Sequence, residues 1–308
     1  MAPSSGDAWR PVRSPHAETL TISAETRLLV VAPHPDDELL AAGGLIQRVH
    51  AAGGTVRIVY LTDGEGYPEG VEAENHVSAP TAGDYRGYGR RRQGEARHAL
   101  ATLHVDESWL KFLSFPDGGL CRLMTTYWSE RASAYESPYT RRDRPPPSNV
   151  VVPATAYRGE DLTQELARLI GDLRPTVIAV PRKEDQHPDH CAAWFFVADA
   201  LGDVERVRRD YRVDVITYVV HYDNWPFQNS GSDLVPPPGI AAGPSGWIRL
   251  TLTESEIAGQ RTALAKFETQ VRVMGWFLNG FTRRNELFSR PADRRVVLPI
   301  RRSPCCRD

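Results

Sequence analysis

The two stretches that decide the fold are His34-Pro35-Asp36-Asp37-Glu38 and His187-Pro188-Asp189-His190. The first follows the apolar run from Arg27 to Pro33, and the second follows the run from Thr176 to Pro181. A segment with apolar residues at helical spacing comes after each, so both stretches predict a strand, a turn and a helix. Turns of this kind lie at the carboxyl ends of parallel strands, where open α/β sheets bind ligands. We therefore expect the imidazoles and carboxylates of the two turns to share one metal site.

The rest of the chain predicts a regular alternation of strands and helices. Strands are expected at 28–32, 56–61, 109–115, 177–180 and 213–220, and helices at 39–52, 90–103, 161–173, 192–201 and from 253 to about 270. Thr253 and Glu256 form a capping box at the start of the last helix. This order predicts a single α/β domain over 21–300, with a strand-rich or irregular carboxyl-terminal part, after an irregular segment at 1–20 and before a frayed tail at 301–308.

Two segments, 65–88 and 121–157, show no clear periodicity and are expected to be long loops. The first is interpreted either as an active-site lid or as a tolerated surface insertion. The second is rich in proline and aromatic residues. It is expected either to form the wall of a binding cleft or merely to cover the sheet.

Composition excludes several classes of protein. The formal net charge is −2, so no basic field is available to hold nucleic acid. Neither a secretory leader nor an apolar run long enough to span a bilayer is recognisable, so we expect a cytoplasmic protein without a membrane span. The four cysteines, Cys121, Cys191, Cys305 and Cys306, predict neither a disulfide framework nor a zinc finger. A homo-oligomer is compatible with the sequence.

His34, Asp37 and His190 form the predicted set of metal ligands. His34 and Asp37 are separated by two residues, so a tight turn that enters a helix can bring both side chains to one point. His190 can supply the third ligand from the neighbouring strand end. Two histidines and one carboxylate leave a position open for water, as catalytic zinc sites do. Zinc is the expected ion, with Fe²⁺ or another divalent metal as the alternative.

Asp36, His187 and Asp189 are the predicted catalytic residues. A bound metal makes water acidic enough to act as a nucleophile near neutral pH. Asp36 lies beside a ligand and is expected to take the proton of that water as general base. His187, as imidazolium, is expected to stabilise an oxyanion and to protonate the leaving amine. Asp189 is expected to hold the orientation of His187.

A structural explanation exists for each cluster alone. Proline fixes φ in a turn, and aspartate caps the helix that follows, so one His-Pro-Asp turn is usually only a turn. Two such clusters at equivalent strand ends favour a metal site. His221 also ends a predicted strand and could approach the site.

The motifs resemble those of the PIG-L (LmbE-like) zinc deacetylases. The resemblance is carried by Ala32-Pro33-His34-Pro35-Asp36-Asp37-Glu38, Leu61-Thr62-Asp63-Gly64 and His187-Pro188-Asp189-His190. Weaker matches are Arg92-Gln93-Gly94-Glu95, Phe115-Pro116-Asp117-Gly118 and Phe267-Glu268-Thr269-Gln270. Together they cover roughly Arg27 to Gln270 in family order.

This resemblance implies a Rossmann-like, mostly parallel sheet flanked by helices, and removal of an acyl group, usually acetyl, from an N-acetylglucosaminyl-type conjugate. It implies the same zinc ligands, base and acid, and it associates Arg92 and Asp117 with contacts to sugar hydroxyls. The alternative for these two is an exposed cation at a helix start and a turn aspartate. Some members carry a tyrosine that assists the oxyanion where this chain has Asp185.

Other functions remain compatible with the same ligands. The substrate could instead be a thiol conjugate or another natural-product amide. Two histidines and one carboxylate are also the ligand set of non-haem iron oxygenases, although Asp36 and His187 would have no role there. A metal-binding protein without catalytic activity is the fourth hypothesis.

Overall fold

The computed structural model describes residues 20–129, 131, 133–227, 231–244, 246–300 and 304–306. Apart from Leu20, the segment 1–20 that was predicted to be irregular lies outside the described residues. Among the described residues, no helix is both long enough and apolar enough to cross a membrane.

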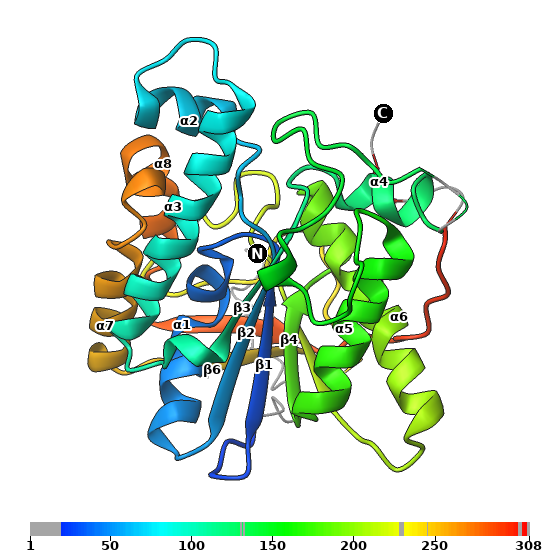
Figure 1. Cartoon of the computed structure of the whole chain (residues 1–308). Helices are drawn as coiled ribbons and strands as arrows, with labels where there is room; N and C mark the ends of the chain where they lie inside the picture. The colour runs from blue at the N-terminus through cyan, green and yellow to red at the C-terminus, as the bar shows by residue number, and fades with distance from the viewer. Residues whose placement is uncertain are drawn as a thin grey trace, which may run out of the picture.

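Seven strands form one sheet in the order β3-β2-β1-β4-β5-β7-β6 (Figure 1). Five of them run parallel: β1 (Arg27–Ala32), β2 (Thr55–Thr62), β3 (Leu110–Phe115), β4 (Val177–Pro181) and β5 (Asp214–Tyr218). The remaining two pair in antiparallel fashion at one edge, namely β6 (Trp247–Thr251) and β7 (Asn285–Ser289). The predicted α/β class with a mostly parallel sheet is therefore confirmed.

The order of the strands reverses between β1 and β4. After β1 the chain adds β2 and β3 on one side, and it then returns to add β4 and β5 on the other. Connections on opposite sides leave a crevice at the carboxyl ends of the two central strands, which is where open α/β sheets bind ligands. The turn that carries His34 follows β1, and the start of α6, which carries His190, follows β4, so the fold brings both histidines to the crevice.

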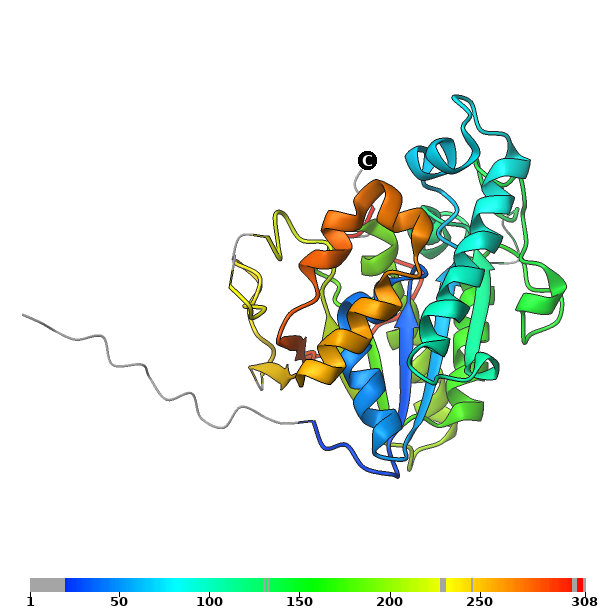
Figure 2. The ribbon, with the colours of Figure 1, turned by 90° about the vertical axis from the view of Figure 1, so that its left-hand side faces the viewer.

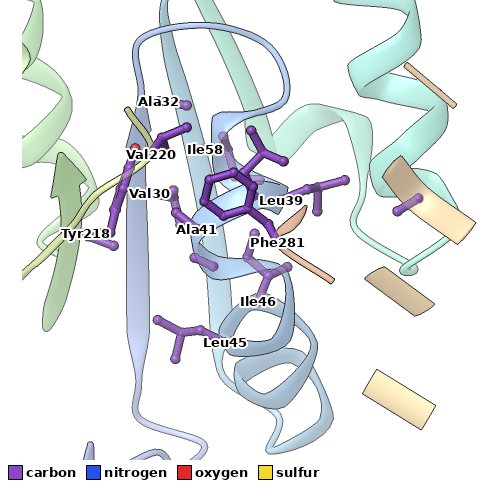
Figure 3. Packing of buried hydrophobic residues seen from close by; sticks show 14 of the residues in the cluster. Val30, Ala32, Leu39, Ala41, Leu45, Ile46, Ile58, Tyr218, Val220 and Phe281 are labelled. Atoms are coloured by element: carbon purple, nitrogen blue, oxygen red, sulfur yellow. The ribbon is translucent and has the colours of Figure 1, made fainter. Parts of the chain in front are cut away.

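Helices cover both faces of the sheet (Figures 1 and 2). One face carries α1 (Asp37–Ala51), α3 (Ala82–Ala101), α7 (Glu254–Leu264) and α8 (Glu268–Gly280). The other carries α4 (Leu120–Thr125), α5 (Gly159–Leu173) and α6 (Pro188–Val207). Leu28 and Val30 of β1 point into the first core and Leu29 and Val31 into the second, which is why the strand is an unbroken apolar run. Figure 3 shows the first core around α1, with Phe281 packed against it.

The helix α1 is broken at Ala42, about one helical turn after the segment His34–Asp37. Ala42 has the non-helical angles φ −141° and ψ 20°, and the helix restarts beyond it. The carboxylate of Glu286 on β7 accepts hydrogen bonds from the amides of Gly44 (2.5 Å) and Leu45 (3.0 Å), which caps the restarted segment. A Cβ atom at Gly44 would lie 2.3 Å from the Leu252 side chain, so this position requires glycine.

The first predicted loop, 65–88, is largely helical, so this expectation was wrong. It contains α2 (Pro68–Asn75) and the first turns of α3. Pro68 occupies the first turn of α2, and Thr81 and Asp84 form a capping box at the start of α3. The second loop, 121–157, is mostly irregular as predicted, apart from α4 and a 3-10 turn at Pro147–Asn149.

In the carboxyl-terminal part, the structure has two helices where the sequence predicted one from 253 to about 270. The capping box of Thr253 and Glu256 is confirmed, but the predicted helix ends at Leu264 and α8 begins at Glu268. A further 3-10 turn, Glu107–Trp109, precedes β3.

Two disulfides correct the interpretation of the cysteines. Cys306 is bonded to Cys121 in α4, and Cys305 is bonded to Cys191 in α6. The partners lie 185 and 114 residues apart, so no local spacing reveals them. Residues 304–306 of the predicted frayed tail are therefore attached to two helices near the site. One is α4, which follows the turn with Asp117, and the other is α6, which carries His190.

We expect the denatured, unreduced protein to show no free thiol with Ellman's reagent and four after reduction. Closing loops of more than 100 residues removes roughly 5 kcal/mol of denatured-state entropy per bond in the chain-entropy model. The double variant Cys305→Ser, Cys306→Ser should therefore melt well below the oxidised protein, and close to the reduced wild-type protein. Four reactive thiols before reduction would contradict the pairing.

Candidate metal centre and active site

The turn after β1 presents its side chains from a strained backbone. Asp36 has φ 129°, a conformation that residues other than glycine rarely adopt and that is common at functional sites. Surrounding groups hold it: the Asp36 amide donates to Glu38 (3.0 Å), and the Arg92 guanidinium donates to the carbonyls of Pro35 (2.6 Å) and Gly64 (2.8 Å). The turn is thus fixed from both sides before any ligand binds.

The three predicted metal ligands meet in a small triangle. His34 Nδ1 lies 3.2 Å from Asp37 Oδ2, His190 Nε2 lies 3.1 Å from the same oxygen, and the two ring nitrogens are 3.2 Å apart. Ligand atoms about 2.1 Å from one zinc ion at tetrahedral angles are about 3.4 Å from each other. The triangle therefore has nearly the dimensions that a single tetrahedral metal requires.

The outward-facing nitrogens of the two histidines show where their protons lie. His190 Nδ1 is 3.3 Å from Asp185, and His34 Nε2 is 3.1 Å from Asp117. A carboxylate on the outer side of each ring favours the tautomer with its proton there, which leaves the lone pairs of His34 Nδ1 and His190 Nε2 facing Asp37. Three electron pairs that point at one another without a hydrogen between them fit a cation.

The electrostatics of the buried cluster favour the same conclusion. Burial alone would lower the pKa of His34, but the nearby carboxylates of Asp117, Asp189 and Asp37 raise it well above its usual value. Asp37 and Asp185 likewise overcome burial and raise the pKa of His190 to about 9. Burial is also outweighed at Asp37, where His190 lowers the pKa of the carboxyl well below its usual range. Without a metal ion, these carboxylates would keep a second proton on each of the two imidazoles, and one divalent cation in the triangle would replace those two positive charges.

Asp185, which was not among the predicted site residues, lies buried against the predicted ligand His190. Its carboxylate accepts hydrogen bonds from the amides of Val220 (2.8 Å), His221 (3.1 Å) and His187 (3.0 Å), in addition to facing His190. It is 3 % exposed. A carboxylate held in this way fixes the orientation of the His190 ring, as such carboxylates do for histidines that bind metals. A carboxylate five residues beyond the end of the strand predicted at 177–180 was the signal available in the sequence.

The Asp189 carboxylate has partners on the turn after β3 and at His34, whereas the sequence led us to expect it at His187. Its carboxylate accepts hydrogen bonds from the amides of Gly118 (2.7 Å) and Leu120 (3.1 Å), and it lies 3.6 Å from His34 Nε2. His187 instead receives a hydrogen bond at Nδ1 from the Asp189 amide (3.3 Å) at the start of α6. Asp189 therefore joins the turn after β3 to the site, while its backbone orients His187.

His187 is accordingly a neutral donor in this geometry. Burial, together with the positive charges of His34 and His190, lowers the pKa of His187 to about 4. Because Nδ1 accepts the amide hydrogen, the ring proton lies on Nε2. The imidazolium expected from the sequence is disfavoured.

Arg92 and Asp117 both line the pocket beside the predicted ligands, and the side chain of each is already paired within the protein. The Arg92 guanidinium is buried and lies 3.0 Å from Asp36 Oδ2. Burial raises the pKa of Asp36 to about 7, against the opposing charge of Arg92. Asp117 accepts a hydrogen bond from the Gly66 amide (2.6 Å) and faces His34. Arg92 is therefore a residue that positions the general-base candidate, in contrast to the exposed cation of the alternative interpretation.

A pocket of about 280 Å³ opens above the cluster. One part of its wall is polar, with Arg92, Asp117 and the backbone of Gly66, and another part is apolar, with Leu40, Met274 and Phe277. The segment 65–88 contributes Gly66 and Tyr67 to the lining, in agreement with the lid interpretation more than with a remote insertion. From the segment 121–157, Tyr139 packs against Gly66 beside the pocket, since a Cβ there would lie 2.8 Å from its ring.

His221 also reaches the pocket, as its place after β5 suggested. Its ring centroid is 4.9 Å from that of His190 and 5.3 Å from that of His187, and Phe277 stacks on it at 5.2 Å. Its ring nitrogen can approach Asp37 and His190 within 4.8 Å, so it belongs to the same cluster. Met274 and Phe277 come from α8, and nothing in the sequence indicated that these two side chains would line the pocket.

We expect Asp185→Asn to weaken zinc affinity about 10- to 100-fold, because the amide cannot accept all the hydrogen bonds that orient His190. Competition with a chromogenic chelator measures the affinity. Asp172→Asn, an exposed carboxylate on α5 that pairs with Arg168, is the matched control and should bind zinc as the wild type does. Equal affinities for all three proteins would show that Asp185 does not orient the metal ligand.

Comparisons with known proteins agree with this geometry. The family model described as GlcNAc-PI de-N-acetylase (PIG-L) matches residues 29–201. A 1D-myo-inositol 2-acetamido-2-deoxy-alpha-D-glucopyranoside deacetylase from Saccharopolyspora erythraea is 32% identical over 62% of this chain and 58% of its own length. The enzyme of the same description from Mycolicibacterium gilvum is 30% identical over 76% of this chain and 70% of its own. The chain thus spans little more than half of the first of these relatives.

Solved structures share the fold at lower identity. A deacetylase triple mutant of the teicoplanin biosynthetic pathway superimposes with a TM-score of 0.53 at 18% identity, over 86% of this chain and 97% of the other. The A40926 pseudoaglycone deacetylase Dbv21 gives a TM-score of 0.51 at 19% identity, with the same coverage.

Proposed function

The chain belongs to the GlcNAc-PI de-N-acetylase (PIG-L) family, and from that premise we propose that it is a metal-dependent hydrolase that removes the acetyl group from an N-acetylglucosaminyl conjugate. The observation that carries the proposal is the triangle of His34 Nδ1, Asp37 Oδ2 and His190 Nε2, with the Asp36 carboxylate in the same pocket. The relatives named above support the amino-sugar substrate.

His34, Asp37 and His190 would hold the metal. Two nitrogen ligands and one oxygen ligand suit zinc, and they also suit Fe²⁺. The ion would lower the pKa of a water molecule and polarise the amide carbonyl of the substrate. The residues around the ion would transfer the protons and stabilise the oxyanion.

Asp36 would act on protons at both ends of the reaction. Its carboxylate takes a proton from the attacking water as the oxygen bonds to the carbonyl carbon. The same proton then passes to the amide nitrogen as the C–N bond breaks, which yields acetate and a free amine. Arg92 keeps the carboxylate in place, since its guanidinium contacts Asp36 and the carbonyl of Pro35 at the same time.

His187 would stabilise the oxyanion. Its proton lies on Nε2, because Nδ1 accepts the Asp189 amide hydrogen. A neutral imidazole can donate this hydrogen to the oxygen that gains charge, but it is a poor proton source for the amine. We therefore assign the acid function that the sequence suggested for His187 to Asp36 instead.

The polar wall would receive the sugar hydroxyls. Asp117 offers carboxylate oxygens there, as the family resemblance implies, and the backbone of Gly66 and Gly118 lies beside it. The partner of the site is thus a small-molecule amino sugar or glycoconjugate. The alternative substrates, a thiol conjugate or another amide, are tested by measuring amine release from them beside the N-acetylglucosamine substrates.

Asp36→Asn should abolish amine release from N-acetylglucosamine substrates while the protein keeps one bound zinc ion, because only the proton acceptor is lost. Amine release with fluorescamine and metal content by mass spectrometry measure the two properties. Near-normal turnover by this variant would refute the proton path.

His187→Gln and His187→Ala separate the two possible roles of His187. Glutamine can still donate a hydrogen bond but cannot act as an acid, so we expect His187→Gln to retain at least about tenfold more activity than His187→Ala. Equally low activities would restore the acid assignment.

A further inference from the structure

Three aromatic rings form a continuous surface beside the catalytic pocket. Phe277 and Trp276 belong to α8, and Phe227 lies on the segment that follows β5. The ring centroids of Phe227 and Trp276 are 5.0 Å apart, those of Trp276 and Phe277 5.9 Å, and those of Phe227 and Phe277 6.0 Å. We call these three residues the aromatic platform.

The platform is exposed, although its side chains are apolar. Trp276 is 67 % exposed, and Phe227 is 37 % exposed. The described residues thus leave most of the Trp276 surface uncovered, which is unusual for a tryptophan unless it contacts a ligand or a partner. Phe227 is nevertheless held in place, since its ring lies where a Cβ atom at Gly280 would be 2.4 Å away. The platform is thus built on a fixed support.

The platform is continuous with the catalytic site. Phe277 lines the pocket and stacks on His221, whose ring is 5.3 Å from that of His187. The apolar wall of the pocket therefore extends outward, from Phe277 to Trp276 and Phe227. This continuity identifies the occupant as a part of the substrate.

We propose that the aromatic platform binds an apolar aglycone, best an aromatic one, attached to the N-acetylglucosaminyl unit. The inference rests on the proposed function and adds the class of conjugate. The acyl carbonyl must reach His34, Asp37 and His190 at the buried end of the pocket. The sugar ring lies next, between its polar and apolar walls. The group that projects from the opposite end of the sugar then meets the exposed rings.

The first test compares substrates with and without such a group. Amine release is measured for free N-acetylglucosamine and for both anomers of phenyl N-acetylglucosaminide, with zinc-loaded protein. We expect kcat/KM to be about tenfold higher for one phenyl glycoside than for the free sugar, as one stacked ring contributes. This ratio should fall to near one in Trp276→Ala.

Val207→Ala is the matched control, because Val207 is an exposed apolar residue (83 %) at the end of α6, outside the pocket lining. It should keep the wild-type ratio. A wild-type ratio near one, or the same loss in both variants, would overturn the proposal.

A second measurement keeps the aglycone proposal separate from the proposed function. If no substrate releases amine, the deacetylase function fails, but calorimetric titration with phenyl glucosaminide and with glucosamine still tests the platform. Tighter binding of the phenyl compound, lost in Trp276→Ala, would support it, and equal binding would overturn it. Sedimentation tests the competing occupant: a dimer that Trp276→Ala dissociates would assign the platform to a second copy of the chain and overturn the proposal.

Discussion

The structure depends on burying several carboxylates and imidazoles at one point, with a partner for each carboxylate that faces His34 or His190. Isolated buried charges are costly, so each must find a partner of opposite charge or a hydrogen-bond donor. Asp37 pairs with His34 and His190. The Asp185 carboxylate accepts hydrogen bonds from three backbone amides, and the Asp189 carboxylate accepts them from two. The partners come from the ends of different strands, so the site forms only when the sheet has its native order.

The same network explains why the turns around the site are rigid. Asp189 on α6 binds the backbone at Gly118 and Leu120, and Arg92 on α3 binds the backbone at Pro35 and Gly64. The turns after β1, β2 and β3 are thereby joined to helices that pack on opposite faces of the sheet. Both disulfides fasten residues 304–306 to α4 and α6 on the face that holds Asp189.

Much of the fold could be predicted from local patterns. The five parallel strands and the two site turns are short apolar runs that end in chemically distinctive residues, and periodicity identifies such elements well. The helices in 65–88 escaped prediction because α2 and the start of α3 have weakly apolar faces, so only Pro68 and the Thr81–Asp84 capping box announced them. The disulfides escaped because their partners are brought together only by tertiary structure.

The site shows the same division between local and tertiary information. The positions of His34, Asp37 and His190 follow from strand ends, but the functions of Arg92 and Asp189 depend on which way each side chain points. The weaker motifs also acquire a structural meaning: Glu95 accepts hydrogen bonds from the amide (2.9 Å) and hydroxyl (2.6 Å) of Thr269.

That contact joins α3 to the start of α8. Gln270 adds a hydrogen bond to the Tyr88 hydroxyl (2.7 Å) beside it. Two short motifs 174 residues apart thus hold α8 against the helix that carries Arg92. Because α8 supplies Met274 and Phe277 to the pocket, a contact remote from the metal cluster sets the distance between the polar and apolar walls. The predicted metal ligands and the α8 side of the apolar wall are therefore built by different parts of the chain, so we expect substitutions on α8 to alter the choice of substrate without disturbing the predicted ligands.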